Sequence, residues 1–367
     1  MSLLHPPADT TEGTIRFELD DDAVQARPGE SIWEAARRHG IEIPHLCHTD
    51  GLRPDGNCRA CVVEIAGERT LAPSCCRAPT PGMQVRARSP RALKSQEMVL
   101  ELLLADLPEQ GHKWQDNDPA RPHGELSDWA DRMGVTPRPA LTALRREAPA
   151  PDLSHPAMAV NLDACIQCNR CVRACREEQV NDVIGYALRG SHSEIVFDLN
   201  DPMGDSTCVA CGECVQACPT GALMPKAHVG SQAVDKRVDS VCPFCGVGCL
   251  LTYNVKDNRI VSVDGRDGPA NHNRLCVKGR FGFDYAHNPQ RLTVPLIRKA
   301  GVPKDPEAIN RLNRDTADWS DVFREATWEE ALDLAAGTLR TLRDTHGKKA
   351  LAGFGSAKGS NEEAYLF

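Results

Sequence analysis

Cysteine is the residue type that stands out in this sequence, with 17 among 367 residues. Sixteen of them fall into four groups of four, and Cys76 is left over. Disulfide frameworks belong to short secreted chains, whereas this chain is long and its first residues show no basic and apolar leader. We therefore expect a cytoplasmic protein whose reduced thiols bind metal.

The first group consists of Cys47, Cys58, Cys61 and Cys75. It has one tight pair flanked by two lone thiols, with a loop bounded by Gly51 and Gly56 inside it. Zinc sites usually carry two tight pairs, so the spacing favours a [2Fe-2S] cluster, in which two irons share four thiolates. A zinc site is the alternative, and Cys76 is able to exchange roles with Cys75.

The second and third groups repeat one pattern, C-x2-C-x2-C-x3-C. The first cysteine run is Cys165, Cys168, Cys171 and Cys175, and the second cysteine run is Cys208, Cys211, Cys214 and Cys218, with Pro219 after it. Three closely spaced thiolates reach three irons of a [4Fe-4S] cluster, and the fourth iron takes its ligand from the other run. We expect one cluster on Cys165, Cys168, Cys171 and Cys218, and another on Cys208, Cys211, Cys214 and Cys175.

The fourth group is Cys242, Cys245, Cys249 and Cys276. Three of these thiols sit in one loop, and the last returns after two strand-like stretches at 250–255 and 259–263. This spacing again suits a [4Fe-4S] cluster.

The elements that position the first group are short. Alternating apolar residues at 15, 17 and 19 indicate a strand, and further strands are expected at 61–65 and 84–88. Ser31 and Glu34 form a capping box for a helix that ends at Gly40. These elements together predict a small sheet crossed by one helix. A second helix is expected over 90–105, with Ser89 as its cap.

The end of the chain has a different character. Thr327 and Glu330 cap a helix that ends at Gly347, and residues 350–355 are predicted to form a buried strand. Ser360 then caps another helix. Because a buried parallel strand needs neighbours, we interpret this region as the incomplete start of an α/β domain, in a chain that is the N-terminal part of something larger. Ser356, Lys358 and Asn361 follow the strand, where α/β sheets bind ligands, and are candidates for lining a cofactor pocket.

Composition excludes some partners. The formal charge of −8 gives no electrostatic reason to expect nucleic acid or an anionic membrane surface. No stretch reaches the ~18 apolar residues that a membrane span needs.

The motif GNCRACVVE resembles the N-terminal ferredoxin domain shared by NuoG, iron-only hydrogenases and NAD-dependent formate dehydrogenases, and CPFCGVGC resembles the N-terminal lobe of the molybdopterin oxidoreductases. The runs RACREEQVNDVIG, CVKGRFGFDYAHNPQRLTVPLIR and GSAKGSNEEAYLF resemble the alpha, catalytic subunit of soluble NAD-dependent molybdenum or tungsten formate dehydrogenases. That family is related to the NuoG subunit of complex I and to the molybdopterin oxidoreductases. The resemblance implies a multidomain α+β chain with the following parts: a tail at 1–13; a β-grasp [2Fe-2S] ferredoxin domain at 14–94; a linker with a degenerate His-Cys cluster region at 95–157; a two-[4Fe-4S] ferredoxin domain at 158–229; a [4Fe-4S] lobe at 235–291; and the truncated start of a molybdopterin-binding α/β domain at 292–367.

The resemblance also implies the activity. Formate is oxidised to CO2 at molybdenum or tungsten held by two molybdopterin guanine dinucleotides. Electrons then pass through one [2Fe-2S] and three [4Fe-4S] clusters to a NuoF-like beta subunit that binds FMN and NAD, with a NuoE-like gamma subunit as a further partner. Lys278 matches the family's lysine between cluster and pterin, for which a solvated loop lysine is the alternative. The family's catalytic residues have no counterpart in this chain.

One departure from the family is informative. A further cluster is usually ligated there by the pattern H-x3-C-x2-C-x5-C. Here the positions hold His112, Asp116, Pro119 and Glu125, which are poor iron–sulfur ligands apart from the histidine. We therefore predict four clusters and about fourteen iron atoms.

Three rival interpretations stay open. A NuoG-like subunit of an NADH dehydrogenase relays electrons without a pterin. An electron-transfer subunit of a hydrogenase or diaphorase does not need the region from residue 238 onward. A non-enzymatic metal store is the third interpretation, and four separately spaced cluster motifs do not favour it.

Overall fold

The computed structural model describes residues 13–108, 124–229, 234–289, 291–307, 319–356, 359 and 361–367. The chain divides into two compact units, which are described separately below. The first unit comprises residues 1–240 and 249–281, and the second comprises 241–248 and 282–367. The predictions at His112, Asp116, Pro119, Lys358 and Ser360 lie outside the described residues.

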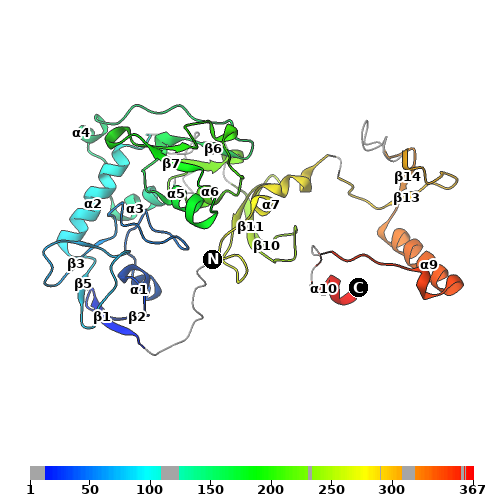
Figure 1. The fold of residues 1–367 in the computed structure, drawn as a ribbon, viewed down its shortest axis with the longest axis horizontal. Helices are drawn as coiled ribbons and strands as arrows, with labels where there is room; N and C mark the ends of the chain where they lie inside the picture. The colour runs from blue at the N-terminus through cyan, green and yellow to red at the C-terminus, as the bar shows by residue number, and fades with distance from the viewer. Residues whose placement is uncertain are drawn as a thin grey trace. The chain divides into compact units, whose positions relative to one another are not determined.

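The N-terminal domain is a mixed five-stranded sheet with one helix packed on it (Figure 1). The sheet order is β2-β1-β5-β3-β4. Its elements are β1 (Ile15–Leu19), β2 (Asp22–Ala26), α1 (Ile32–Arg38), β3 (Val62–Ile65), β4 (Ala72–Pro73) and β5 (Gln84–Arg86). β1 and β5 run parallel, whereas the β1–β2, β3–β4 and β3–β5 pairs are antiparallel.

Local sequence explains these elements. Asp20 and Asp21 both adopt positive φ angles, which gives the two-residue turn between β1 and β2 the twist that a hairpin needs. The capping box predicted at the start of α1 is present, because the Ser31 hydroxyl accepts from the Glu34 N–H and the Glu34 carboxylate accepts from the Ser31 N–H. The core then forms between Ile32 and Trp33 of α1 and strand residues such as Leu19.

Helix α2 (Pro90–Ala105) forms where it was predicted, with Ser89 as its N-cap. It packs on α3 (Glu125–Met133), and a short helix α4 (Pro139–Thr142) follows. Leu100 and Leu126 are buried together with Leu46 and Ala60 of the N-terminal domain. This second core fixes the two helices beside the loop that carries the first cysteine group.

The segment 158–229 is made of very short elements. They include β6 (Met158–Val160), α5 (Arg170–Arg173), β7 (Ile184–Ala187), β8 (Glu194–Phe197), α6 (Glu213–Ala217) and β9 (Leu223–Pro225), with short 3-10 and π turns between them. β6 pairs with β9, β7 pairs with β8, and α5 lies beside α6. The core contains Cys171, Cys175 and Cys214 among its apolar residues, so the thiols are part of the packing.

A three-stranded sheet completes the first unit. It is formed by β10 (Lys236–Val241), β11 (Leu250–Lys256) and β12 (Arg259–Gly265), in that order, and α7 (Val277–Phe281) packs on β12. The strands predicted at 250–255 and 259–263 therefore form.

The second unit contains β13 (Leu296–Arg298) paired with β14 (Phe323–Glu325), α9 (Trp328–His346) and α10 (Asn361–Leu366). Thr327 caps α9 as predicted. The prediction of a buried strand at 350–355 is wrong: residues 351–355 have no strand structure and are exposed. Within the described part of the chain, no strand pairs with this segment, so its apolar side chains are not covered.

Candidate metal centres

The four thiols of the first group converge at one place. The Cys47 N–H donates to the Cys58 sulfur at 3.3 Å, and the Cys61 and Cys75 sulfurs are 3.4 Å apart. The thiols of Cys58 and Cys75 hydrogen-bond to the Cys47 sulfur, which lowers the pKa of the Cys47 thiol well below its usual range. The group is therefore preorganised to present at least one thiolate to a cation.

The structure separates Cys75 from Cys76. Cys75 is fully buried beside Cys61, whereas Cys76 is exposed and its sulfur is 3.6 Å from that of Cys75. A Cβ atom added to Gly56 would lie 2.9 Å from the Cys76 sulfur, so the loop passes close to this spare thiol. This geometry favours Cys75 as the ligand, and the ligand assignment itself stays a prediction.

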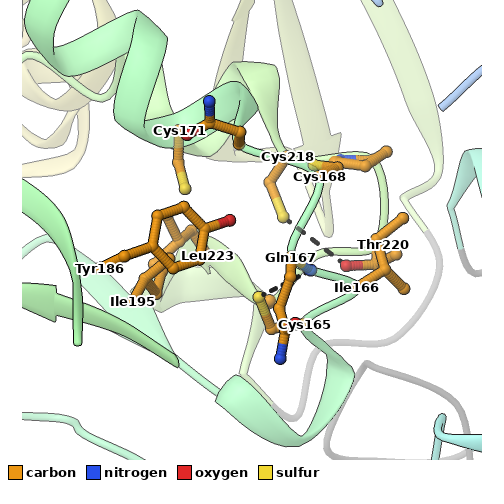
Figure 2. Close-up of a pocket in the computed structure, with 13 residues that line it drawn as sticks. Cys165, Ile166, Gln167, Cys168, Cys171, Tyr186, Ile195, Cys218, Thr220 and Leu223 are labelled. Atoms are coloured by element: carbon orange, nitrogen blue, oxygen red, sulfur yellow. Dashed lines mark hydrogen bonds between the residues drawn. The ribbon is translucent and has the colours of Figure 1, made fainter. Parts of the chain in front are cut away.

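The predicted ligands of the first [4Fe-4S] cluster line one cavity. Figure 2 shows Cys165, Cys168 and Cys171 of the first run around it, with Cys218 of the second run and with Tyr186, Ile195 and Leu223 beside them. Burial raises the pKa of Cys165 to about 11 and that of Cys168 to about 12. Thiolates at these positions therefore need a compensating cation, which is the chemistry that iron would supply.

The other four cysteines of the two runs also interact. Cys175 of the first run lies within electrostatic reach of Cys208, Cys211 and Cys214 of the second run, and each of these three thiols has its pKa raised, first of all by burial. The structure therefore brings together the two sets that the crossed ligation predicts. Among the described residues, no three His, Cys, Asp or Glu side chains are arranged to hold a single metal ion.

The two runs repeat one loop geometry at an offset of 43 residues. Gln167 and Ala210 both have positive φ, and their N–H groups donate to the sulfurs of Cys165 and Cys208, each at 3.4 Å. Asn169 and Gly212 also have positive φ, and each precedes a short helix. The internal repeat seen in the sequence is therefore a repeat of backbone conformation.

The fourth group is divided between the two units. Cys249 and Cys276 belong to the first unit, and Cys242 and Cys245 belong to the second. Cys242 is buried, whereas Cys245 and Cys276 are exposed. Ligation of a cluster by these four residues stays a prediction.

Two arginines between the cysteines of the first run were not identified from the sequence. Arg170 and Arg173 are 1% and 2% exposed. Arg170 makes a bidentate ion pair with Glu125, at 2.6 and 2.7 Å. Glu125 occupies one position of the degenerate cluster pattern, and in the structure it is a partner of this buried guanidinium.

The second run makes a similar contact with the segment 249–281. The buried carboxylate of Glu213 accepts hydrogen bonds from Arg274 at 2.9 Å and from Arg280 at 3.2 Å. Arg280 also donates to the carbonyl oxygen of Cys211 at 3.1 Å. A Cβ at Gly212 would collide with the Arg280 side chain, so the close approach of Arg280 favours glycine there.

The remaining candidates lie apart from these contacts. Lys278 is exposed on α7, directly after Cys276 and Val277. Ser356 is exposed at the end of the segment 351–356, and Asn361 is the first residue of α10. Their roles toward a pterin stay predictions.

Comparison with known proteins agrees with this organisation. Four family models match consecutive parts of the chain. They are described as a 2Fe-2S iron-sulfur cluster binding domain (residues 12–90), a 4Fe-4S dicluster domain (164–222), a molybdopterin oxidoreductase Fe4S4 domain (235–288) and a molybdopterin oxidoreductase (291–367). The chain is therefore an iron–sulfur oxidoreductase chain of mixed α and β structure, and the predicted fold class is confirmed.

Relatives of several kinds cover almost the whole chain. A NuoG protein of the NADH-quinone oxidoreductase from Rhizobium meliloti is 30% identical over 364 residues, which is 96% of this chain and 38% of the relative. The Bacillus subtilis protein YrhE, which carries a provisional formate dehydrogenase name, is 28% identical over 397 residues, again 96% of this chain and 38% of the relative.

A solved structure of an NAD+-reducing [NiFe]-hydrogenase in the H2-reduced state matches with a TM-score of 0.52 and 28% identity, over 60% of this chain and 92% of that chain. The chain is therefore a homologue of NuoG, formate dehydrogenase and NAD-reducing hydrogenase proteins, and it carries the domains of the N-terminal part of a molybdopterin oxidoreductase. It spans about 38% of the length of the Rhizobium meliloti NuoG protein and of YrhE. Among the described helices, none is long and apolar enough to cross a membrane.

Proposed function

We propose that this chain is the N-terminal electron-transfer part of the alpha subunit of an NAD-dependent formate dehydrogenase. The observation that carries the proposal is the convergence of three cysteine groups within one compact unit, in a chain that also matches the molybdopterin oxidoreductase models. When bound, the clusters supply one-electron carriers and a bis-molybdopterin guanine dinucleotide centre with molybdenum or tungsten supplies the oxidation of formate to CO2.

The thiols have the role of ligands in this proposal. The first group holds a [2Fe-2S] cluster, and the two runs hold two [4Fe-4S] clusters with crossed fourth ligands, Cys218 and Cys175. Cys242, Cys245, Cys249 and Cys276 hold a third [4Fe-4S] cluster. The backbone N–H groups that donate to Cys58, Cys165 and Cys208 stabilise the added negative charge of the reduced state.

The proposed route runs from the pterin past Lys278 to the Cys242 group, then through the two runs to the Cys47 group. Contacts between neighbours support this order within the first unit. Arg280 joins the segment 249–281 to the second run, α5 packs on α6 between the two runs, and Arg173 joins the first run to the Cys47 loop.

Two further roles belong to the pterin end. Lys278 would place a positive charge between the Cys242 group and the pterin, and Ser356, Lys358 and Asn361 would line the pterin pocket. Lys278 is exposed and so has room for such a ligand.

The electrons need an acceptor outside this chain. We propose a NuoF-like beta subunit that binds FMN and NAD, with a NuoE-like gamma subunit as a further partner. The similarity to an NAD+-reducing hydrogenase and to an NADH-quinone oxidoreductase protein supports an NAD-linked partner.

Metal analysis of the purified native complex tests the proposal. We expect about fourteen iron atoms in this part of the chain, together with molybdenum or tungsten, and reduction of the clusters by formate under anaerobic conditions. About eighteen iron atoms would contradict the four-cluster assignment. Clusters that NADH reduces and formate leaves oxidised would contradict the formate assignment.

The alternative function is a NuoG-like relay of an NADH dehydrogenase. The Rhizobium meliloti relative favours it, because that protein is named as part of an NADH-quinone oxidoreductase. A relay needs no pterin, so a complex with full iron content and without molybdenum or tungsten would select this alternative.

A further inference from the structure

The positions between the cysteines differ in charge between the two runs, although the backbone repeats. At the offset of 43 residues, Arg170 corresponds to Glu213, and Arg173 corresponds to Gln216. All four lie on α5 or α6, which have the same place in the two halves. A positive charge at these positions is therefore not required by the loop fold itself, because the second run forms the same loop without one.

The partners of these residues differ in the same way. Gln216 contacts Arg280 at 2.7 Å and the Asn273 carbonyl, both in the segment 249–281. Arg173 donates to the carbonyl oxygens of Cys47 and Arg53, which lie in the loop of the first cysteine group. Each run thus faces a different neighbour. In the pair formed by Arg173 and Gln216, the charged residue Arg173 faces the Cys47 group.

Arg173 is held in a demanding environment. Its side chain is almost fully buried, and its Nε atom has no hydrogen-bond partner. Arg170 supports it by donating to the carbonyl oxygen of His48, the residue after Cys47. A buried guanidinium is costly unless its donors are satisfied, so these carbonyls hold the Cys47 loop and the guanidinium together.

We propose that Arg173 is a positioning residue for the [2Fe-2S] cluster, holding the Cys47 loop against the first run and favouring the reduced cluster through its positive charge. The inference rests on the proposed function, because it requires a cluster at the Cys47 group. Reduction adds one electron and no proton, so the cluster becomes more negative by one charge. A buried positive charge close to the ligand Cys47 stabilises that state.

A redox titration with dithionite as the electron donor tests this, with electron paramagnetic resonance to follow the [2Fe-2S] signal in the native complex. In Arg173→Gln, which keeps a donor and loses the charge, reduction should become about tenfold less favourable, which corresponds to a potential about 59 mV lower for one electron. Arg173→Lys keeps the charge and should stay within about twofold of wild type. Arg176→Gln is the matched control, because Arg176 is exposed in the same run and pairs with Asp182.

The comparison of the two variants decides the outcome. A lower potential, or loss of the signal, in Arg173→Gln and not in Arg173→Lys supports the inference. Equal behaviour of the two variants overturns it, whether both match wild type or both lose the cluster. A wild-type complex without a [2Fe-2S] signal would overturn the inference and the cluster assignment together. A wild-type complex with that signal and no response to formate would overturn only the proposed function.

Discussion

The N-terminal domain and the segment 158–229 differ in how their cysteine side chains take part in the core. In the N-terminal domain, apolar residues from a five-stranded sheet and α1 form most of the core, and Cys61 and Cys75 are buried among them. In the segment 158–229, Cys171, Cys175 and Cys214 are core residues, and the strands are three or four residues long. Thiols thus make up a larger share of the smaller core in the segment 158–229 than of the core in the N-terminal domain.

This difference concerns how metal binding is coupled to folding. A site that exists before the metal arrives costs little folding free energy to fill, whereas a small core that includes several ligands depends more strongly on its metal. Burial raises the pKa of the Cys171 and Cys214 thiols well above the usual range, so these cores cannot hold bare thiolates. The predictions below test this contrast, from the largest expected effect to the smallest.

Removal of iron by a chelator under anaerobic conditions should have the largest effect. Amide hydrogen exchange in β6 and β9 should approach that of an unfolded chain, because their pairing rests on the thiol-containing core. The amides of β1, β3 and β5 should stay protected, since their sheet has an apolar core. Equal loss of protection in both regions would remove the contrast.

Substitution of a single ligand should have a smaller and local effect. Cys218→Ala should lose about four of about fourteen iron atoms, because Cys218 shares a cavity with Cys165, Cys168 and Cys171. Iron per chain and the cluster signals measure this. Cys76→Ala is the control and should keep the full iron content, since Cys76 is exposed. Iron loss in the control would show that Cys76, rather than Cys75, is a ligand.

A cavity in the apolar core of the N-terminal domain should destabilise that domain with or without iron. Leu19 is fully buried, so Leu19→Ala should lower the free energy of unfolding of this domain by about 3 kcal/mol. Denaturant-dependent hydrogen exchange of the β1 and β5 amides measures the change. Leu102→Ala, at an exposed position on α2, should change it by less than about 0.5 kcal/mol.

Loss of a helix cap should give the smallest effect. Ser31→Ala removes the acceptor for the Glu34 N–H at the start of α1 and should cost about 1 kcal/mol in the same measurement. Ser31→Asp restores an acceptor and should recover most of it. A loss much larger than this would mean that the buried Ser31 has a role beyond capping.

Sequence patterns predicted the elements that carry a local signal. Ser31 with Glu34, and Ser89 followed by Pro90, marked the starts of α1 and α2, because a helix cap is formed by residues that are neighbours in the sequence. Cysteine spacing also grouped Cys218 with the first run, and Cys218 lines one cavity with Cys165, Cys168 and Cys171, whereas ligation by these thiols stays a prediction. These predictions depend on short-range geometry.

Features that depend on distant partners were missed. The pairing of β6 with β9 joins residues more than sixty positions apart, and strands of three residues show no period. Arg170 and Arg173 resemble a charged surface in the sequence, and their burial depends on carbonyls more than 100 positions away. The strand predicted at 350–355 failed for the same reason, because an apolar run needs a pairing partner that the pattern does not name.

The contact of Arg274 has a consequence for the order of events during synthesis. Its guanidinium donates to the Gly51 carbonyl at 3.1 Å and contacts Glu178 and Glu213, so it joins three parts of the chain that are up to 223 positions apart. A ribosome adds roughly 5–20 residues per second, so Arg274 is made tens of seconds after Gly51. The sheet and α1 can form in that interval, and Arg170 and Arg173 can reach the Cys47 loop before Arg274 adds the last of these contacts.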